Sequence, residues 1–263
     1  MSQKVIDAHI HFDMYSEEER EQMLQELDSH QVTSLIAVSC HLSSAEKNLE
    51  LSQLDERIKP AFGFHPEQPL PTADRLEALH RFIRRHQEKM IAVGEVGLPY
   101  YLRKENSTVS IEPYLEALEQ FIQLSVEVHK PIVLHAIYED APLVCDLLEK
   151  YAVRKAHFHW FKGDAKTMKR MEENGYSLSI TPDVLYEKEI QQLVQRYPLT
   201  KMMAETDGPW PFEGPLEGKR THTGMLHETI PKIAQLKGVK TATVYQQLYD
   251  NTTRFYELDE KYM

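Results

Sequence analysis

The stretch that decides the fold is VIDAHIHF (residues 5–12), a short apolar run that contains an Asp-x-His-x-His pattern. Side chains alternate between the two faces of a β-strand, so Asp7, His9 and His11 share one face. Two imidazoles side by side at a strand end form half of a divalent metal site. The stretch therefore predicts a buried strand with metal ligands at its carboxyl end. Asp7 is expected to orient a ligating imidazole as a hydrogen-bond acceptor.

Beyond this stretch, β-rich runs alternate with helix-patterned segments. Several runs, such as residues 34–38, are almost continuously apolar, as in a parallel sheet covered by helices. We expect strands at Val5–Phe12, Thr33–Cys40, Ile58–His65, Met90–Leu98, Pro131–Ile137, Lys155–Trp160, Tyr176–Ile180 and Lys201–Asp207. We expect helices at Glu17–His30, Ser44–Asp55, Ala73–Gln87, Ile111–His129, Glu139–Tyr151, Asp164–Asn174, Glu187–Arg196, Thr223–Leu236 and Thr241–Tyr256.

This alternation predicts an α/β fold, a (β/α)₈ TIM barrel formed as a single domain over residues 1–263. The alternative is an open doubly wound sheet. Its dinucleotide-binding version is disfavoured, because no Gly-x-Gly-x-x-Gly follows the first strand. Pro99–Ser110 and Gly208–His222 are expected to be long loops, and both follow strands with candidate ligands. Active-site loops leave a barrel from those strand ends.

Composition narrows the function. The formal net charge of -11 argues against a broad basic surface that wraps duplex nucleic acid. A bound cation would still allow a nucleic-acid substrate, because it adds positive charge locally. The two cysteines, Cys40 and Cys145, predict buried reduced thiols. With no signal-like or membrane-spanning run, we expect a cytoplasmic protein without a membrane. The sequence does not indicate an oligomeric state.

Four more candidate ligands follow later β-rich runs: Glu95, His135, His159 and Asp207. His157 precedes His159 by two residues and is expected to be a core or supporting histidine. A carboxylate inside the Val-Gly-rich run around Glu95 would be costly to bury unpaired, which favours a metal-bridging role. Asp207 precedes a Gly-Pro turn, so it could be a simple turn residue. Opposite four histidines it is better interpreted as a ligand that also accepts a proton from water.

This donor set suits a pair of divalent cations. Four histidines and two carboxylates form a mixed nitrogen and oxygen set that is compatible with Zn²⁺, Mn²⁺, Co²⁺, Fe²⁺ or Mg²⁺. Two such ions about 3.5–4 Å apart generate a nucleophile from water and stabilise charge on a phosphoryl or carbonyl oxygen. The pattern therefore predicts a hydrolase with its centre at the carboxyl end of the barrel.

Five ordered motifs resemble one known family. The opening Asp-x-His-x-His is similar to that of the amidohydrolase superfamily. GFHP (residues 63–66), GEVGL (94–98), HWFKG (159–163) and ETDGP (205–209) resemble the TatD family of metal-dependent deoxyribonucleases and related hydrolases. The resemblance runs from residue 7 to about residue 211, with the motifs in the family's order.

The resemblance implies two metal sites. One would be formed by His9, His11, Glu95 and Asp207, the other by Glu95, His135 and His159, with Asp207 as the catalytic proton acceptor. It implies that His65 lines the substrate pocket without ligating, although His65 could instead only hold its turn. The sequence departs from the family where substrate is held: Pro99 replaces an Asp, Ala136-Ile137-Tyr138 follows His135, and Lys219-Arg220-Thr221-His222-Thr223 replaces an Arg-Asn-Glu-Pro segment.

Three functions follow as hypotheses. The first is a phosphodiesterase or deoxyribonuclease that acts on DNA or RNA ends. The second is a small-molecule amidohydrolase or lactonase with the same centre. The third is a non-catalytic protein with a vestigial site, which the complete ligand set disfavours. Candidate phosphate-binding cations at the rim are Arg103, Lys104, Lys162, Lys219 and Arg220, and candidate base-stacking rings are Tyr100, Tyr101, Trp160, Trp210 and Phe212. Each group could equally be ordinary surface or loop anchoring.

Overall fold

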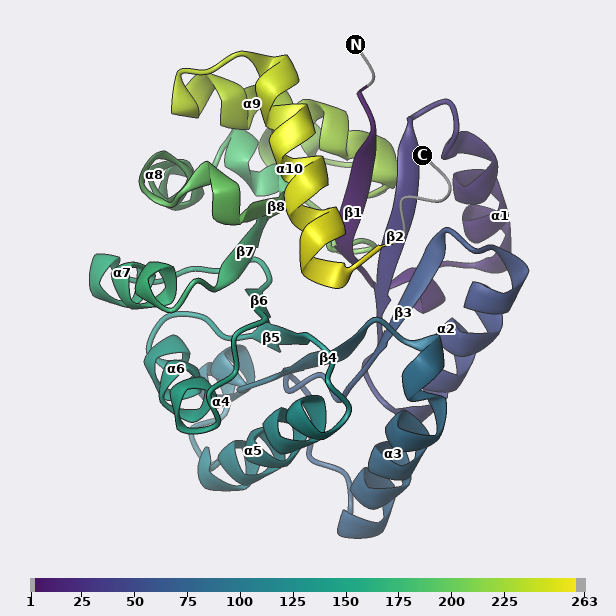
Figure 1. The fold of residues 1–263 in the computed structure, drawn as a ribbon, viewed down its shortest axis with the longest axis vertical. Helices are drawn as coiled ribbons and strands as arrows, with labels where there is room; N and C mark the ends of the chain where they lie inside the picture. Colours follow the sequence, from purple (N-terminus) through teal and green to yellow (C-terminus); the bar gives the residue numbers. More distant parts are fainter. Residues whose placement is uncertain (1–2, 259–263) are drawn as a thin grey trace.

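The computed structural model describes residues 3–258, and its centre is a ring of eight parallel strands. Each strand pairs with the next in chain order, and helices lie around the outside of the ring (Figure 1). The predicted (β/α)₈ TIM barrel is therefore confirmed. The strands are β1 (Val5–Ile10), β2 (Val32–Val38), β3 (Ile58–Phe62), β4 (Ala92–Gly97), β5 (Ile132–His135), β6 (Ala156–Phe158), β7 (Ser177–Ile180) and β8 (Met202–Ala204).

The predicted helices are also present, with ends that differ by a few residues. Local capping explains several starts: the Ser16 hydroxyl and the Glu19 carboxylate form a reciprocal capping box at α1. The helices are α1 (Glu17–Glu26), α2 (Leu42–Leu54), α3 (Ala73–His86), α4 (Tyr100–Glu105), α5 (Glu112–Glu127), α6 (Asp140–Lys150), α7 (Ala165–Glu173), α8 (Lys188–Arg196), α9 (Leu226–Lys237) and α10 (Thr241–Tyr256). Short 3₁₀ turns add η1 (Phe12–Met14), η2 (Gln87–Lys89), η3 (Pro182–Leu185), η4 (Leu199–Lys201), η5 (Gly214–Leu216) and η6 (Thr223–Met225).

One prediction was wrong: part of the expected loop Pro99–Ser110 is the helix α4. The cause is a tertiary contact. The carboxylate of Glu67, from the loop after β3, accepts hydrogen bonds from the backbone N–H groups of Tyr101 and Leu102 at 2.9 and 2.7 Å. These bonds satisfy donors that a helix start leaves unpaired. A partner more than 30 residues away leaves no local sequence signal.

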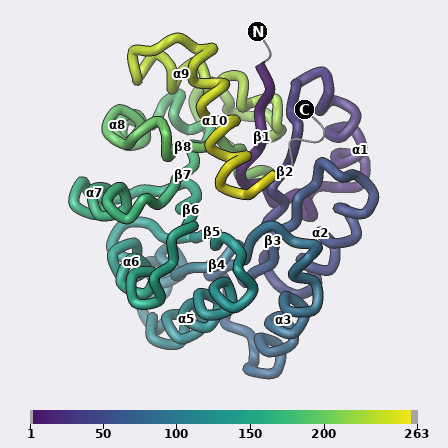
Figure 2. Tube along the Cα trace, viewed as in Figure 1, coloured from purple at the N-terminus to yellow at the C-terminus, as the bar shows by residue number. Residues whose placement is uncertain are grey.

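The barrel closes where the first and last strands meet. In Figure 2 the yellow helix α10 lies beside the purple strand β1, and both elements contact β8. The His9 carbonyl accepts a hydrogen bond from the Asp207 N–H at 3.0 Å, and the Gly208 carbonyl accepts one from the His11 N–H at 2.8 Å. The hydrogen bonds that close the barrel therefore involve the backbone of three predicted ligands. They lie at the carboxyl end of the strands, which we call the mouth.

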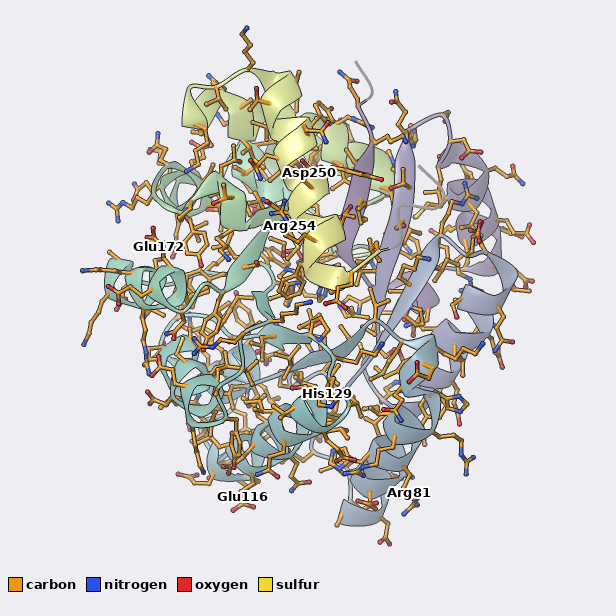
Figure 3. All side chains as sticks on the ribbon, in the orientation of Figure 1. Arg81, Glu116, His129, Glu172, Asp250 and Arg254 are labelled. Carbon is orange, nitrogen blue, oxygen red and sulfur yellow. The ribbon has the colours of Figure 1, made fainter. Side chains whose placement is uncertain are left out.

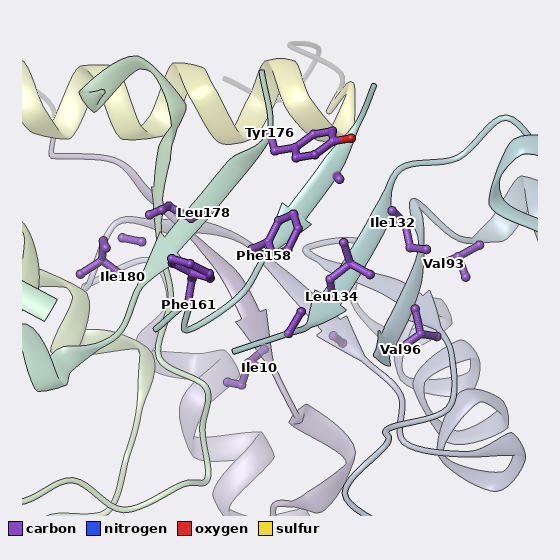
Figure 4. Packing of buried hydrophobic residues seen from close by; sticks show 14 of the residues in the cluster. Ile10, Val93, Val96, Ile132, Leu134, Phe158, Phe161, Tyr176, Leu178 and Ile180 are labelled. Carbon is purple, nitrogen blue, oxygen red and sulfur yellow. The ribbon is translucent and has the colours of Figure 1, made fainter. Parts of the chain in front are cut away.

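Apolar packing outside the ring holds the strands in place. Figure 4 shows Leu134 of β5, Phe158 of β6 and Leu178 of β7 within the buried cluster. Strand alternation directs the neighbouring residues to the opposite, inner side. On β6 this gives Phe158 to the hydrophobic layer and leaves His157 and His159 to the barrel interior.

The outer helix faces are polar. Figure 3 labels charged side chains that project from them, including Arg81 on α3, Glu116 on α5 and Glu172 on α7. None of the helices within residues 3–258 is long and apolar enough to cross a membrane. Cys40 and Cys145 are both free and buried, as predicted.

Candidate metal centre

The six predicted ligands converge at the mouth, although they come from five strands. None is more than 9% exposed. Parallel strands bring their carboxyl ends to one side of a barrel, so ligands that are far apart in sequence meet there. The set comprises His9 of β1, His11 directly after β1, Glu95 of β4, His135 of β5, His159 directly after β6, and Asp207 after β8.

Glu95 lies at the centre of the group. Its Oε2 atom is 3.1 Å from His9 Nε2 and 3.4 Å from His11 Nε2. Its Oε1 atom is 3.1 Å from His135 Nδ1 and 2.7 Å from His159 Nε2. One carboxylate oxygen thus faces each pair of imidazoles, which is the geometry expected of a bridging ligand.

The close approach of β3 and β4 explains why residue 63, directly after β3, is a glycine. A Cβ atom on Gly63 would lie 2.5 Å from the backbone oxygen of Glu95. Any larger residue would push β3 away from the strand that carries the carboxylate.

Asp207 completes the group from the opposite side of the barrel. Its Oδ1 atom lies 3.3 Å from His9 Nε2 and 3.4 Å from His11 Nε2. Its backbone is in the left-handed region, with φ of 50°, as is that of Trp160, with φ of 38°. Such conformations cost about 1–3 kcal/mol each outside glycine and gather at functional sites. Both residues occupy turns that leave the mouth.

Several buried polar atoms in this group have no hydrogen-bond partner. Fully buried donors and acceptors are normally paired, so a cluster of unpaired ones needs a further group to satisfy it. Three overlapping sets of ligand atoms lie within 4.8 Å of one another: His9, His159 and Asp207; His9, His11 and Glu95; His65, Glu95 and His135. The donor set therefore fits divalent cations. The unpaired atoms are His9 Nδ1 and Nε2, Glu95 Oε2, His159 Nδ1 and Asp207 Oδ1.

Electrostatics keep both carboxylates ionised. Burial alone would raise the pKa of Glu95, but the surrounding imidazoles, led by His159, hold it well below its usual range. Burial is likewise outweighed at Asp207, where the nearby imidazoles of His11 and His9 lower the pKa of the carboxyl. Two adjacent carboxylates that remain charged at neutral pH attract cations.

The histidines respond differently to the same surroundings. Burial lowers the pKa of His9, but carboxylates led by Glu95 outweigh it and raise that pKa to about 10. In the same way, Glu67 and Glu95 overcome burial and raise the pKa of His135 to about 9. Burial prevails at His159, whose pKa falls to about 4. Protonated His9 and His135 therefore balance the two carboxylates, and a cation bound there would release these protons.

His65 lies nearer to the ligands than its predicted pocket-lining role requires. Its Nε2 atom is 3.4 Å from Glu95 Oε1. Its Nδ1 atom accepts a hydrogen bond from the Glu67 N–H at 3.2 Å. A neutral ring that accepts at Nδ1 carries its proton on Nε2, which then has no lone pair for a metal. This geometry favours His65 as a hydrogen-bond donor at the wall of the mouth.

Asp7 differs from its predicted role. Its carboxylate accepts hydrogen bonds from the Thr206 N–H at 3.0 Å and the Thr206 hydroxyl at 2.5 Å, and from the His9 backbone N–H at 3.3 Å. No imidazole donates to it within residues 3–258. Asp7 therefore ties β1 to the segment before Asp207, and it acts on the backbone of the ligands rather than on a ring.

His157 is a supporting histidine, as expected. Ser179 donates its hydroxyl hydrogen to Glu205 Oε2 at 2.5 Å, so His157 Nε2–H donates to Ser179 Oγ, also at 2.5 Å. The Tyr256 hydroxyl then donates to His157 Nδ1 at 2.6 Å. We call these four residues the inner network. Every ring nitrogen and hydroxyl in it has a partner.

Two of the predicted rim cations are already paired. Arg103 bonds the buried Asp140 at 2.6 Å, which ties α4 to α6. Arg220 bonds the half-buried Glu19 at 2.8 Å. Lys162 lies 5.3 Å from the ring centroid of Trp160. Lys162 and Arg220 remain candidates for phosphate contacts, whereas the charge of Arg103 is largely committed to Asp140.

Aromatic rings form two groups at the rim. Trp160 contacts Trp210 and Phe212, with centroids 6.3 and 5.7 Å apart. On the other side Tyr100 contacts Tyr101 at 5.3 Å. Trp210 is 59% exposed and Tyr101 is 42% exposed, so each group presents one ring to solvent. Phe212 is buried and anchors its loop.

Sequence reasoning missed three residues that support the ligands. Glu67 Oε1 is 3.1 Å from His135 Nε2. Cys40 Sγ is 3.4 Å from His11 Nδ1. Glu205 accepts the Trp160 N–H at 2.7 Å and so holds the turn after His159. Glu67 follows the GFHP motif and Glu205 opens the ETDGP motif, so proximity to motif residues was the available signal.

Comparison with known proteins gives a consistent family. The model of TatD-related DNases matches residues 6–257. A protein of Haemophilus influenzae, described as an uncharacterized metal-dependent hydrolase, is 36% identical over 97% of this chain and 100% of its own length. Human deoxyribonuclease TATDN3 is 26% identical over 96% of this chain and 94% of its own length.

Solved structures agree on the fold. The crystal structure of YjjV, a TatD homologue from Escherichia coli, superposes with a TM-score of 0.85 at 21% identity and covers 97% of this chain and 98% of its own. Together with the family model and the 36% identical relative, the geometry at the mouth has one interpretation: this chain belongs to the family of TatD-related DNases.

Proposed function

We propose that this chain is a metal-dependent hydrolase that cleaves phosphodiester bonds, with DNA or RNA ends as its substrate class. The observation that carries the proposal is Glu95, a fully buried carboxylate whose two oxygens face two separate pairs of imidazoles. The names of the relatives, metal-dependent hydrolase and deoxyribonuclease, support the same reading.

The proposed centre holds two divalent cations. Bound there, they would lower the pKa of a water molecule and stabilise charge on a phosphoryl oxygen. Glu95 is proposed to bridge the two positions. The ligands proposed for the first position are His9, His11, Glu95 and Asp207, and those for the second are Glu95, His135 and His159.

Asp207 is the proposed catalytic proton acceptor. Its carboxylate is ionised, because His11 and His9 hold the pKa of Asp207 below its usual range despite burial. Its Oδ1 atom has no hydrogen-bond partner and belongs to the ligand group at the mouth. A water molecule that attacks the substrate beside it would transfer a proton to Oδ1.

Substrate contacts are proposed for the rim. His65 can donate from Nε2 to a phosphate oxygen, and Lys162 and Arg220 can pair with the flanking charge. Trp210 and Tyr101 offer exposed rings on which a base could stack.

A substrate panel tests the proposal. The purified protein, stripped of metal and reloaded with Mn²⁺, Mg²⁺, Zn²⁺, Co²⁺ or Fe²⁺, is incubated with single-stranded DNA, RNA, dinucleotides, a chromogenic phosphodiester, lactones and amides. Glu95→Gln protein, prepared in the same way, gives the background rate. We expect metal-dependent cleavage of the phosphodiesters and up to two ions per chain.

Two outcomes would contradict this proposal. Turnover of lactones or amides without phosphodiester cleavage would assign the same centre to carbonyl substrates. Equal rates for the wild type and Glu95→Gln would remove the centre from the reaction.

A further inference from the structure

Glu67 lies outside the predicted ligand set but contacts both the centre and the rim. It follows β3, its side chain is 14% exposed, and its carboxylate makes three hydrogen bonds. Oε1 accepts from His135 Nε2 at 3.1 Å and from the Tyr101 N–H at 2.9 Å. Oε2 accepts from the Leu102 N–H at 2.7 Å. One side chain thus contacts a metal ligand and the start of α4.

The bond to His135 decides which ring nitrogen faces the centre. A carboxylate only accepts, so Nε2 of His135 must carry a hydrogen toward Glu67. The other nitrogen, Nδ1, is then available 3.1 Å from Glu95 Oε1 and 3.2 Å from His159 Nε2. A partner that fixes the tautomer and orientation of a ligating histidine is a common support of metal sites.

The backbone of Glu67 acts on a second ring. Its N–H donates to His65 Nδ1 at 3.2 Å and directs His65 Nε2 toward Glu95. Glu67 therefore orients the rings of His135 and His65. In each ring it contacts the nitrogen that does not face Glu95.

The bonds to α4 link the centre to the rim. α4 has only six residues, and a helix this short is not stable by itself. Its start depends on Glu67, and its Arg103 is bonded to Asp140 of α6. Tyr101, the exposed ring on this side of the mouth, receives its backbone position from the same carboxylate.

We propose that Glu67 is a positioning residue that holds His135 in its ligating orientation and couples occupancy of the metal centre to the docking of α4. His135 would hold a cation through Nδ1, which would keep the ring proton on Nε2 and strengthen its bond to Glu67. The Oε1 atom that accepts it also holds Tyr101. By linkage, the effect is reciprocal: docking of α4 favours metal binding as much as metal binding favours docking. The inference rests on the metal centre of the proposed function but is independent of its substrate.

Metal affinity is the first test. Mn²⁺ and Zn²⁺ are titrated calorimetrically into metal-free wild type, Glu67→Ala, Glu67→Gln and Glu116→Gln. Glu116 is exposed on α5 and serves as the matched control for the Glu-to-Gln change (Figure 3). We expect Glu67→Ala to weaken the tighter binding step by about 10–100-fold, the range seen when such supporting partners are lost. Glu116→Gln should bind as the wild type does.

Glu67→Gln separates the two halves of the proposal. Its amide oxygen can still accept from His135 and Tyr101, but its NH₂ group would meet the N–H of Leu102, donor against donor. We expect a smaller loss of affinity than in Glu67→Ala, together with faster hydrogen exchange at Leu102. This isosteric variant also keeps the test valid if the alanine variant folds poorly, which a thermal melt would reveal.

Hydrogen exchange at the start of α4 is the second test. Mn²⁺ broadens nearby NMR signals, so Zn²⁺ is used. In the wild type, Zn²⁺ should slow exchange of the Tyr101 and Leu102 amides, and in Glu67→Ala these amides should exchange fast with or without the ion. Affinities of Glu67→Ala within twofold of the wild type, or wild-type exchange that ignores Zn²⁺, would overturn the inference. If the wild type binds both ions but hydrolyses nothing on the panel, only the proposed function fails.

Discussion

Two buried polar regions of the barrel interior differ in how their atoms are paired. In the inner network, both nitrogens of His157 and the hydroxyls of Ser179 and Tyr256 are hydrogen-bonded. Two residues further along the same run, His159 leaves Nδ1 unpaired, and Oε2 of the neighbouring Glu95 is unpaired as well. Both histidines are at most 3% exposed, so burial does not separate them. The pairing of the ring nitrogens therefore separates His157 from His159, which is a proposed ligand.

The largest expected effect on activity concerns Asp207, the proposed proton acceptor at the mouth. Asp207→Asn keeps the shape of the side chain but removes the basic oxygen. Hydrolysis should fall about 10²–10⁴-fold, the range associated with loss of a general base. Steady-state rates on a chromogenic phosphodiester measure this, with exposed Asp74→Asn on α3 as the matched control. Full activity of Asp207→Asn would reject its role as proton acceptor.

The two histidines test the contrast itself. In metal-free protein, His157→Ala should lower the free energy of unfolding by about 2–4 kcal/mol, because it opens a cavity and strands Ser179 and Tyr256. His159→Ala should lower the free energy of unfolding by less, because its Nδ1 atom has no hydrogen-bond partner that the substitution would leave unpaired. Urea titrations measure both values.

Adding Mn²⁺ should stabilise the two variants by different amounts, with the larger gain in His157→Ala. At a free concentration of 100 times its Kd, an ion stabilises the wild type and His157→Ala by about 2.7 kcal/mol. His159→Ala should gain little. Equal losses in the metal-free variants, or equal gains with Mn²⁺, would break the contrast between the two regions.

Asp183 extends this comparison to a buried carboxylate in which each oxygen accepts a hydrogen bond. Thr181 donates to one oxygen and the Trp160 Nε1–H to the other at 2.6 Å. Burial nevertheless raises the pKa of Asp183 to about 6. A raised pKa means that the folded state holds the proton more tightly, so this group contributes stability at low pH that is lost as the pH rises from about 4 to 6.

This loss of stability with rising pH can be measured against a variant that does not titrate at residue 183. Between pH 4 and pH 7 the wild type should lose on the order of 2 kcal/mol relative to Asp183→Asn. Urea titrations of both proteins across this range provide the comparison. A constant difference would mean that Asp183 titrates normally in the folded protein.

The smallest effect is expected at the rim. Arg220 is 54% exposed and bonded to Glu19, so its removal should hardly change stability. If it grips phosphate, Arg220→Ala should raise KM for a phosphodiester about threefold and leave kcat unchanged. Arg81→Ala, on the exposed face of α3, is the control (Figure 3). An unchanged KM would reject phosphate binding by Arg220.

Local patterns predicted the barrel well, because the apolar runs and helix periods of each βα unit lie close together in sequence. The convergence of the six candidate ligands was also predictable, since His-x-His and a carboxylate in a glycine-rich strand are local signals. The supporting contacts were not. Asp7 was expected to bond a ring but bonds Thr206, 199 residues away, and α4 starts on Glu67. Such contacts depend on which strands become neighbours, and no local pattern records that.

Closure of the barrel also sets the order in which the protein can be completed during synthesis. The hydrogen bonds from Asp207 to His9 and from His11 to Gly208 join residues almost 200 positions apart. A growing chain therefore carries its first two histidines through most of translation without the backbone partners that close the barrel. Contacts of this sequence separation are among the slowest to form. Asp207, a proposed ligand, reaches the other candidate ligands only after β8 has emerged, so the last strand completes the barrel and the proposed centre in one event.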